Sequence, residues 1–349
     1  MASRRSLMDA VTRAGEIIRT SGMLDRIKND GYARVDPFLV AARFDLPVML
    51  RPLDKLLGAY VGGDAPGVLI NSARPPGQVH MTCAHELGHH FLGHPTTTDE
   101  EVAYEREAQS IEQEADTFAY HLLAPRQLIA RIAKGKRWSA SDLSVPMVIY
   151  QLSLRLGVSY RAMVWTLRSQ EIFDYSTAAD LAAVAPARLK RALLPSVRAE
   201  GDDDSAFTKD VWLLDKADAQ FILEPRAGDR FLIDLPNHLS SGYEWTVDQA
   251  REEGFTLEPL LESTTPSSTV GSEEPFVAGG GSVRYTVKAS TPLADDRPES
   301  LPLDFIETRP WQRATAPRDR FETVAQFEVL LQGLDDRTKQ AMLAGVEPP

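Results

Sequence analysis

The stretch "CAHELGHHFLGH" runs from Cys83 to His94 and decides how the first half of this chain is interpreted. The chain has seven histidines, and four of them lie in this stretch: His85, His89, His90 and His94. Residues four apart on a helix project from the same face about one turn apart, so His85 and His89 can share one metal ion. Glu86, beside the first of them, can reach a water on that ion without binding the ion itself. The spacing therefore predicts a metal site on a helix.

The five residues from His85 to His89 read HExxH, which on a helix is typical of zinc peptidases. A catalytic zinc site needs a third protein ligand and an open position for water. His94 does not fit the metzincin pattern, because that pattern requires Gly and His where this chain has Leu92 and Pro95. The third ligand must therefore come from elsewhere.

The segment "EREAQSIEQEADTFAYHLLAP", residues 105–125, supplies carboxylates one helix downstream. Its apolar residues recur at helical spacing, and it ends at a proline. We expect Glu114 to be the third ligand, with Glu112 as the alternative. Carboxylates two positions apart on a helix do not both face one ion easily.

These two motifs closely resemble those of the ImmA/IrrE metallopeptidases, in which a histidine helix is followed by an acidic helix of the form E-x-E-A-N-x-F-A. The resemblance covers roughly residues 1–175 and includes "GVLIN" at 67–71. Two positions depart from the family: Asp116 stands where Asn is frequent, and Cys83 where an aliphatic residue is usual. The resemblance implies a mostly helical, zincin-like α+β domain that binds Zn²⁺.

The resemblance also implies the reaction and the substrate. Glu86 would act as the catalytic base, taking a proton from water that attacks a peptide carbonyl and passing it to the leaving amine. The family cleaves DNA-binding repressors, which implies a helix-turn-helix regulator as substrate. Four side chains are candidates for stabilising the carbonyl oxygen: His90, His94, Tyr104 and Tyr120.

Three other features near these motifs each have two interpretations. Asp116 either orients a ligand histidine or is an exposed carboxylate. Cys83 either senses oxidants or simply packs in the core. The helix-turn-helix rhythm at 146–173, with Gly157 at its turn, either docks a repressor or DNA, or completes the peptidase fold, which is the interpretation that we favour.

Composition limits the function classes. The chain has 349 residues, enough for two or three domains, and is 43% hydrophobic and 25% charged, as in ordinary globular proteins. Its formal net charge of -12 argues against direct nucleic-acid binding. A single cysteine, no continuous apolar leader and no long apolar run suggest a cytoplasmic protein without membrane contact.

In the second half of the chain the spacing of hydrophobic residues changes from helical to alternating. Residues 176–209 are rich in Ala, Arg and Asp and predict a linker or helical bridge. Residues 210–332 contain short alternating runs between Gly, Pro and Ser clusters, which predicts an all-β, immunoglobulin-like sandwich. We assign 333–349 to a C-terminal tail. The chain is thus expected to be multidomain.

Three phrases in the β half resemble the loops of chagasin-like cysteine-peptidase inhibitors: "LSSGYEW" (239–245), "AGGGSVRYTV" (278–287) and "TRPWQ" (308–312). The first loop departs from the family, since His238 and Leu239 replace an Asn-Pro pair. The resemblance implies three adjacent loops that contact a protein partner. Their candidate contact residues are Ser240, Ser241, Gly242, Gly279, Gly280, Arg309, Pro310 and Trp311.

Two functions compete on this sequence. In the first, the chain is a zinc endopeptidase whose β domain regulates activity or recognises a partner. In the second, it is an inhibitor of papain-like cysteine peptidases, and its first half is a scaffold. The joint presence of His85, Glu86, His89 and Glu114 favours the first.

Overall fold

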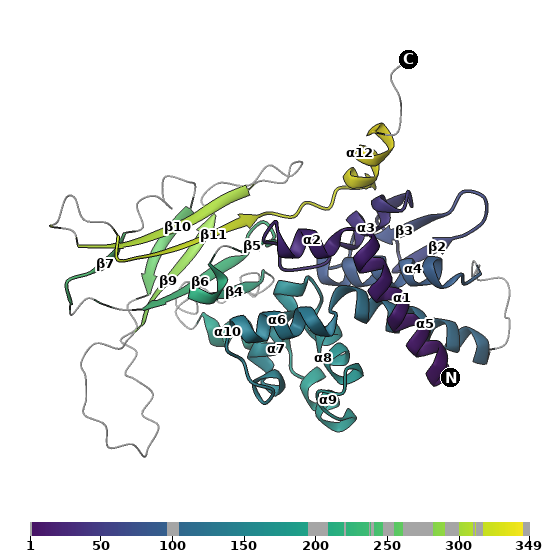
Figure 1. Ribbon diagram of the computed structural model, residues 1–349, viewed down its shortest axis with the longest axis horizontal. Helices are drawn as coiled ribbons and strands as arrows, with labels where there is room; N and C mark the ends of the chain where they lie inside the picture. Colours follow the sequence, from purple (N-terminus) through teal and green to yellow (C-terminus); the bar gives the residue numbers. More distant parts are fainter. Residues whose placement is uncertain are drawn as a thin grey trace. The chain divides into compact units, whose positions relative to one another are not determined.

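The computed structural model divides into two compact units, Met1–Ala185 together with Leu330–Pro349, and Pro186–Val329 (Figure 1). It describes residues 2–95, 105–194, 209–219, 221–236, 238, 241–246, 255–260, 282–289, 300–309, 311 and 317–344. No helix in these ranges is long and apolar enough to cross a membrane.

Helices make up most of the first unit. They are α1 (Arg4–Thr20), α2 (Met23–Lys28), α3 (Pro37–Arg43), α4 (Pro76–Leu92), α5 (Glu105–Leu123), α6 (Arg126–Gly135), α7 (Pro146–Leu156), α8 (Tyr160–Ser169) and α9 (Tyr175–Ala182), with a short 3-10 turn at Asp142–Ser144. Side chains that accept backbone N–H groups fix several of their starts. Ser3 caps α1, and Asp36 accepts from the N–H groups of both Phe38 and Leu39 to cap α3.

A four-stranded sheet completes this unit, in the order β12-β1-β3-β2. Its strands are β1 (Val48–Arg51), β2 (Gly58–Val61), β3 (Gly67–Asn71) and β12 (Gly333–Leu334). Strands β1 and β3 are parallel, whereas β2 runs antiparallel to β3. The buried Asn71 side chain donates to the carbonyls of Leu53 and Leu56, both at 2.7 Å, and thereby holds the loop that leads into β2.

The C-terminal segment differs from the expected tail. Strand β12 pairs with β1, and the Asp335 N–H donates to Val48 O at 2.9 Å. Helix α12 (Asp336–Ala344) then packs on α3, where Arg337 lies 2.8 Å from the Asp36 carboxylate. The sequence could not show this because β12 is only two residues long and its partners lie almost three hundred positions earlier.

The second unit contains helix α10 (Pro186–Leu193) and two four-stranded sheets, β5-β11-β10-β7 and β4-β6-β9-β8. Its strands are β4 (Val211–Asp215), β5 (Ile222–Leu223), β6 (Arg230–Pro236), β7 (Glu244–Thr246), β8 (Phe255–Leu260), β9 (Ser282–Ala289), β10 (Ser300–Thr308) and β11 (Asp319–Gln326). The rings of Tyr285 on β9 and Phe305 on β10 lie 5.7 Å apart, so side chains from the two sheets meet. The expected β region is therefore present, while its immunoglobulin-like topology stays a prediction.

The region 176–209 contains most of α9 and all of α10. The Asp174 carboxylate caps α9 by accepting the Thr177 N–H at 2.8 Å. Helix α10 is anchored in the second unit, because Lys190 pairs with Asp210 at 2.9 Å. This region therefore contributes a helix to each unit, and residues 195–208 lie outside the described ranges.

Candidate metal centre

Helix α4 carries the histidines, and a proline and a glycine mark its two ends. Pro76 occupies the first turn, where a missing N–H costs nothing. Gly93 ends the helix with a φ of 71°, in the left-handed region that glycine tolerates. The chain then turns back, and the His94 N–H donates to His89 O at 2.9 Å. This turn brings His94 back towards the last helical residues.

Helices α4 and α5 approach closely at one glycine. A Cβ atom at Gly88 would lie 3.0 Å from Ala115 Cα and 3.1 Å from Ala115 O, tighter than ordinary van der Waals contact. Glycine opposite alanine therefore lets the two backbones come together. The contact holds one face of α5 beside His85 and His89.

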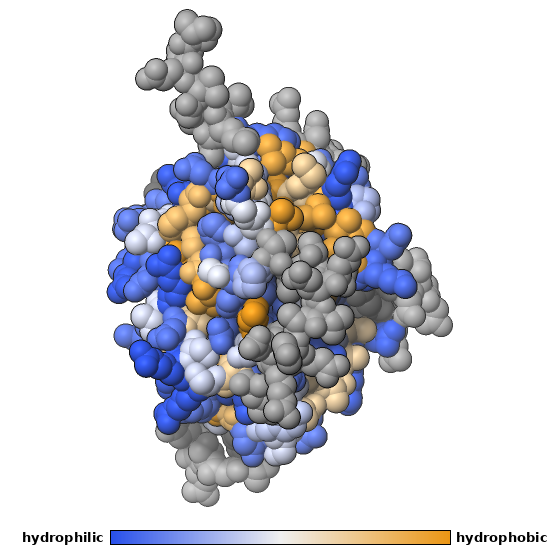
Figure 2. Space-filling view, turned by 90° about the vertical axis from the view of Figure 1, so that its right-hand side faces the viewer, coloured by the Kyte–Doolittle hydropathy of each residue, from blue (hydrophilic) through white to orange (hydrophobic). Residues whose placement is uncertain are grey.

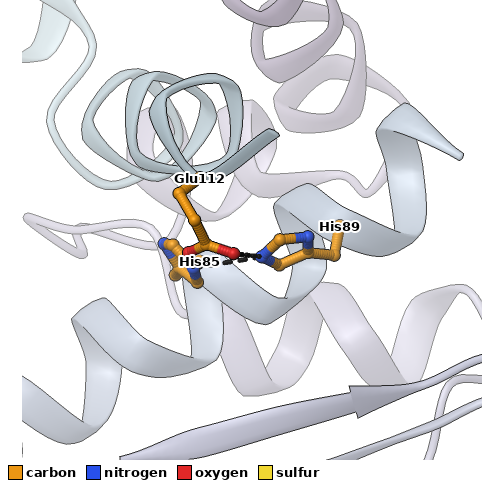
Figure 3. Close-up of side chains that lie close together, drawn as sticks. All are labelled: His85, His89 and Glu112. Atoms are coloured by element: carbon orange, nitrogen blue, oxygen red, sulfur yellow. Dashed lines mark hydrogen bonds and ion pairs between the residues drawn. The ribbon is translucent and has the colours of Figure 1, made fainter. Parts of the chain in front are cut away.

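Three side chains meet at this contact (Figure 3). His85 Nε2 lies 3.1 Å from His89 Nε2 and 3.0 Å from Glu112 Oε2. Glu112 Oε1 lies 3.5 Å from His89 Nε2. His89 is buried, with 6% of its side chain exposed, whereas 51% of the Glu112 side chain is exposed, so the cluster has an open side.

Glu112, and not the expected Glu114, joins the two histidines. Two positions on an α-helix correspond to a rotation of about 200°, so the two carboxylates leave α5 in nearly opposite directions. Glu114 Oε2 instead lies 3.4 Å from His94 Nε2. Both carboxylates were candidates from the sequence. The packing of α5 on α4 places Glu112, the alternative candidate, beside the two histidines.

The remaining polar side chains hold the histidine rings in place. Asp116 Oδ1 lies 2.9 Å from His85 Nδ1, so Asp116 orients a ring of the cluster while half of its own side chain stays exposed. His94 Nδ1 lies 3.1 Å from His89 Nδ1. Contacts of this kind leave the two Nε2 atoms directed at the same point.

The electrostatics of the cluster favour a cation between its members. Burial acts to lower the pKa of His85, but hydrogen bonds to Asp116 and Glu112 outweigh it and raise that pKa to about 10. Burial and the neighbouring His85 lower the pKa of His89 to about 4, so its ring is neutral and able to ligate. Carboxylates that favour a proton here would favour a metal ion for the same reason.

Glu86 lies beside the cluster, against strand β2. It is buried, at 8% exposure, and a Cβ atom at Gly58 would lie 3.2 Å from its Oε1. Burial raises its pKa to about 7, with Glu112 adding to the rise, while His85 and a hydrogen bond with the Tyr60 backbone oppose it. A carboxylate with a pKa near 7 suits a general base at neutral pH.

Tyr60 of β2, which no sequence motif singled out, contacts the histidine helix. The Tyr60 hydroxyl is 3.1 Å from His90 Nδ1. Of the sequence candidates for stabilising the carbonyl oxygen, Tyr120 is largely buried, and burial raises its pKa to about 12, with Asp116 adding to the rise. Tyr104 lies outside the described residues. Only the position of Tyr60 on β2, two elements before the histidine helix, could have indicated it.

In the second unit, two of the predicted partner-binding loops lie against each other. A Cβ atom at Gly242 would overlap the Trp311 ring, and the φ of Gly242 is 77°, in the left-handed region that favours glycine. Arg309 Nη2 donates to Ser241 O at 3.4 Å, and its guanidinium lies 4.5 Å from the centre of the Tyr243 ring. Trp311 is 66% exposed and available for contact. The other predicted contact residues lie outside the described ranges: Ser240, Gly279, Gly280 and Pro310.

The histidine helix and the acidic helix both lie within a region that matches a known family. Residues 41–168 match the family model Peptidase_M78, the IrrE N-terminal-like domain. This match supports a metallopeptidase of the IrrE type, and that family implies a metal ion. No curated protein matches the chain.

Two solved structures are also similar to a part of the chain. One is a cysteine protease inhibitor from Entamoeba histolytica, with 15% identity, 34% of this chain and 97% of the inhibitor covered, and a TM-score of 0.25. The other is amebosin, with 16% identity, coverages of 34% and 98%, and the same TM-score.

Within the IrrE-like region, the helix pair α7 and α8 packs in the fold. A Cβ atom at Gly77 of α4 would lie 2.8 Å from the Ser159 backbone nitrogen, and the Gly157 carbonyl lies 2.8 Å from His80 Nδ1. The turn between α7 and α8 thus contacts the start of the histidine helix. These contacts support the interpretation that the pair completes the peptidase fold.

Cys83 of the IrrE-like region is fully buried, and we predict that it is unreactive in the folded protein. Burial raises the pKa of its thiol well above the usual range, with Asp36 and Asp335 adding to the rise. Because the thiolate is the reactive form, we expect a thiol-specific chromogenic disulfide to label unfolded protein quickly and native protein at least about 100-fold more slowly. Rapid labelling of native protein would instead support the oxidant-sensing interpretation.

Proposed function

We propose that this chain is a zinc-dependent endopeptidase whose metal ligands are His85, His89 and Glu112. The observation that carries the proposal is the spacing of their ligand atoms, 3.0 to 3.5 Å. Tetrahedral zinc with bonds of about 2.0–2.1 Å requires ligand atoms about 3.3 Å apart, so the donor set fits this ion. Two imidazoles and one carboxylate are also a known ligand set of zinc peptidases.

Zinc bound there would supply Lewis-acid activation of water and of a peptide carbonyl. Glu86 would take the proton from that water and pass it to the leaving amine. Its burial and the backbone hydrogen bond with Tyr60 fix the carboxylate beside the cluster. His90 and the Tyr60 hydroxyl are our candidates for stabilising the charge that develops on the carbonyl oxygen.

Strand β2 provides a place for the substrate backbone. In the described part of the chain it is the last strand of its sheet, beside Glu86, so an extended peptide can pair with its outer edge. Leu56, Leu57 and Val61 are exposed on or next to this strand. Figure 2 shows that apolar surface forms separate patches among hydrophilic residues on the face to the right in Figure 1.

The substrate that we propose is a helix-turn-helix transcriptional repressor, cleaved in the cytoplasm. The match to the IrrE N-terminal-like domain supports this class. We further propose that the β domain regulates cleavage or recognises a protein partner through the loops at Gly242 and Trp311. Inhibition of cysteine peptidases by the whole chain is not favoured, because the metal centre would then have no role.

We expect Glu86→Gln to lower the rate of cleavage by at least about 100-fold while the protein keeps its zinc. Glutamine has nearly the same shape but cannot accept a proton from water. The assay follows cleavage of repressors encoded near this gene, with metal content measured on the same samples. A chelator should abolish cleavage by the wild type, and added zinc should restore it. Undiminished cleavage by Glu86→Gln would contradict the proposed mechanism.

A further inference from the structure

A groove on the first unit lies away from the residues used above. It is bordered by α1 and α2 on one side and by the end of α5, the start of α6 and the end of α8 on the other, and its volume is about 1110 Å³. Most of its exposed surface is apolar, and its apolar side chains include Leu7, Val11, Ile18, Leu24, Ile27 and Leu128. A surface groove of this size and polarity suits an apolar ligand.

The rim of the groove is basic although the chain as a whole is acidic. Six exposed cations line it: Arg4, Arg19, Lys28, Arg126, Arg131 and Arg168. Glu171 is the only carboxylate among its lining residues. The formal net charge of the chain is -12, so this concentration of positive charge stands out from the rest of the surface. The rim would therefore attract a negatively charged ligand.

A buried polar atom in the groove lacks a partner. Gln170 is 7% exposed, and its Nε2 donates to Ala124 O at 2.7 Å, which fixes the orientation of the amide. Its Oε1 has no hydrogen-bond partner in the described part of the chain. Leaving a buried acceptor unpaired is unfavourable for the folded state. Because this oxygen has almost no solvent-accessible surface, a ligand lying on the groove surface does not reach it.

The spread of the cations distinguishes a peptide from a small anion. Arg4 and Arg19 stand fifteen positions apart on α1, which corresponds to about 22 Å along the helix. One carboxylate or phosphate group cannot reach both, whereas a helical peptide of about fifteen residues can.

We propose that this groove binds an apolar peptide segment of a partner protein that is flanked by aspartate and glutamate residues. The apolar side chains of the segment lie on the groove floor, and its carboxylates face the cations of both rims. Because α5 also carries Glu112, the partner would contact the same helix as the proposed metal centre, but binding does not require the metal.

Gly15 allows a matched pair of variants. It lies on α1, lines the groove and is exposed, and a Cβ atom there meets nothing within 4 Å. Gly15→Trp would fill part of the groove, and its Cβ atom would meet no other atom of the fold. Gly15→Ala serves as the control, since it makes a similar gain in helix propensity and leaves the groove open.

The test is selection of a random library of about fifteen-residue peptides on the full-length protein, followed by affinity measurement with fluorescein-labelled peptides. We expect the enriched peptides to be apolar with Asp or Glu at both ends. They should bind wild type and Gly15→Ala alike and Gly15→Trp at least about tenfold more weakly. Exchanging their acidic residues for lysine should weaken binding similarly.

Several results would overturn the proposal. No enrichment, enrichment without an acidic excess, or equal binding to Gly15→Trp would each do so. Binding of dodecanoate that Gly15→Trp abolishes, with no peptide selected, would show a site for small amphiphiles. A dimer in sedimentation velocity that Gly15→Trp dissociates would show that a second copy of this chain is the occupant.

Discussion

Glu112→Gln is expected to lower the affinity of the protein for zinc by at least about 100-fold, whereas Glu114→Gln should change it only a few-fold. The Glu112 carboxylate lies 3.0 Å from His85 and 3.5 Å from His89, but Glu114 contacts only His94 among the histidines described. Removing a direct ligand lowers the zinc affinity more than changing a residue that is linked to the ion only through His94 and His89. Competition titration with a chromophoric chelator measures both variants.

The two variants control for each other, because each replaces one exposed or half-buried carboxylate on α5 by its neutral isostere. Circular dichroism on both checks that the helix is retained. If Glu114→Gln lost zinc while Glu112→Gln kept it, the ligand assignment would be wrong. Equal losses would also contradict the assignment, because they would mean that zinc binding depends on both carboxylates.

Arg337→Leu is expected to lower the free energy of unfolding of the first unit by about 3 kcal/mol. The guanidinium lies between the carboxylates of Asp36 and Asp335, at 2.8 and 3.3 Å, and the side chains of both are 4% exposed. Leucine keeps much of the packing on Phe38, over whose ring the guanidinium lies, but leaves two buried carboxylates without this cation. Chemical denaturation followed by helical circular dichroism measures the change.

Lys339→Ala is the control for this effect. Lys339 pairs with Asp336 at 2.7 Å on the same helix, and both side chains are nearly half exposed. Solvent screens such a pair, so we expect a change of no more than about 0.5 kcal/mol. Equal effects of the two variants would mean that the contact of α12 with α3 contributes little to the stability of the unit.

The sequence predicted which histidines come together at the site but left open which carboxylate joins them. The i, i+4 spacing of His85 and His89 places both rings on one helix face wherever the helix lies. The choice between Glu112 and Glu114 depends on how α5 is rotated against α4, and that rotation is set by the contact of Gly88 with Ala115. No pattern along one helix contains that information.

The fold likewise combines features that the sequence predicted with one that it did not. Alternating runs predicted strands in the second half, and the motifs at Gly242 and Trp311 indicated loops that the structure indeed brings together. The return of the chain to the first unit was missed, because β12 has two residues and Arg337 finds Asp36 only after folding. Contacts between distant positions leave no periodic signal in a single sequence.

The most direct test of the proposed metal centre is anomalous X-ray scattering at the zinc absorption edge, from crystals of protein grown in the presence of zinc. We expect one strong peak within about 2.0–2.2 Å of His85 Nε2, His89 Nε2 and a Glu112 oxygen. A zinc peak at His94 and Glu114, or no peak between His85 and His89, would contradict the account.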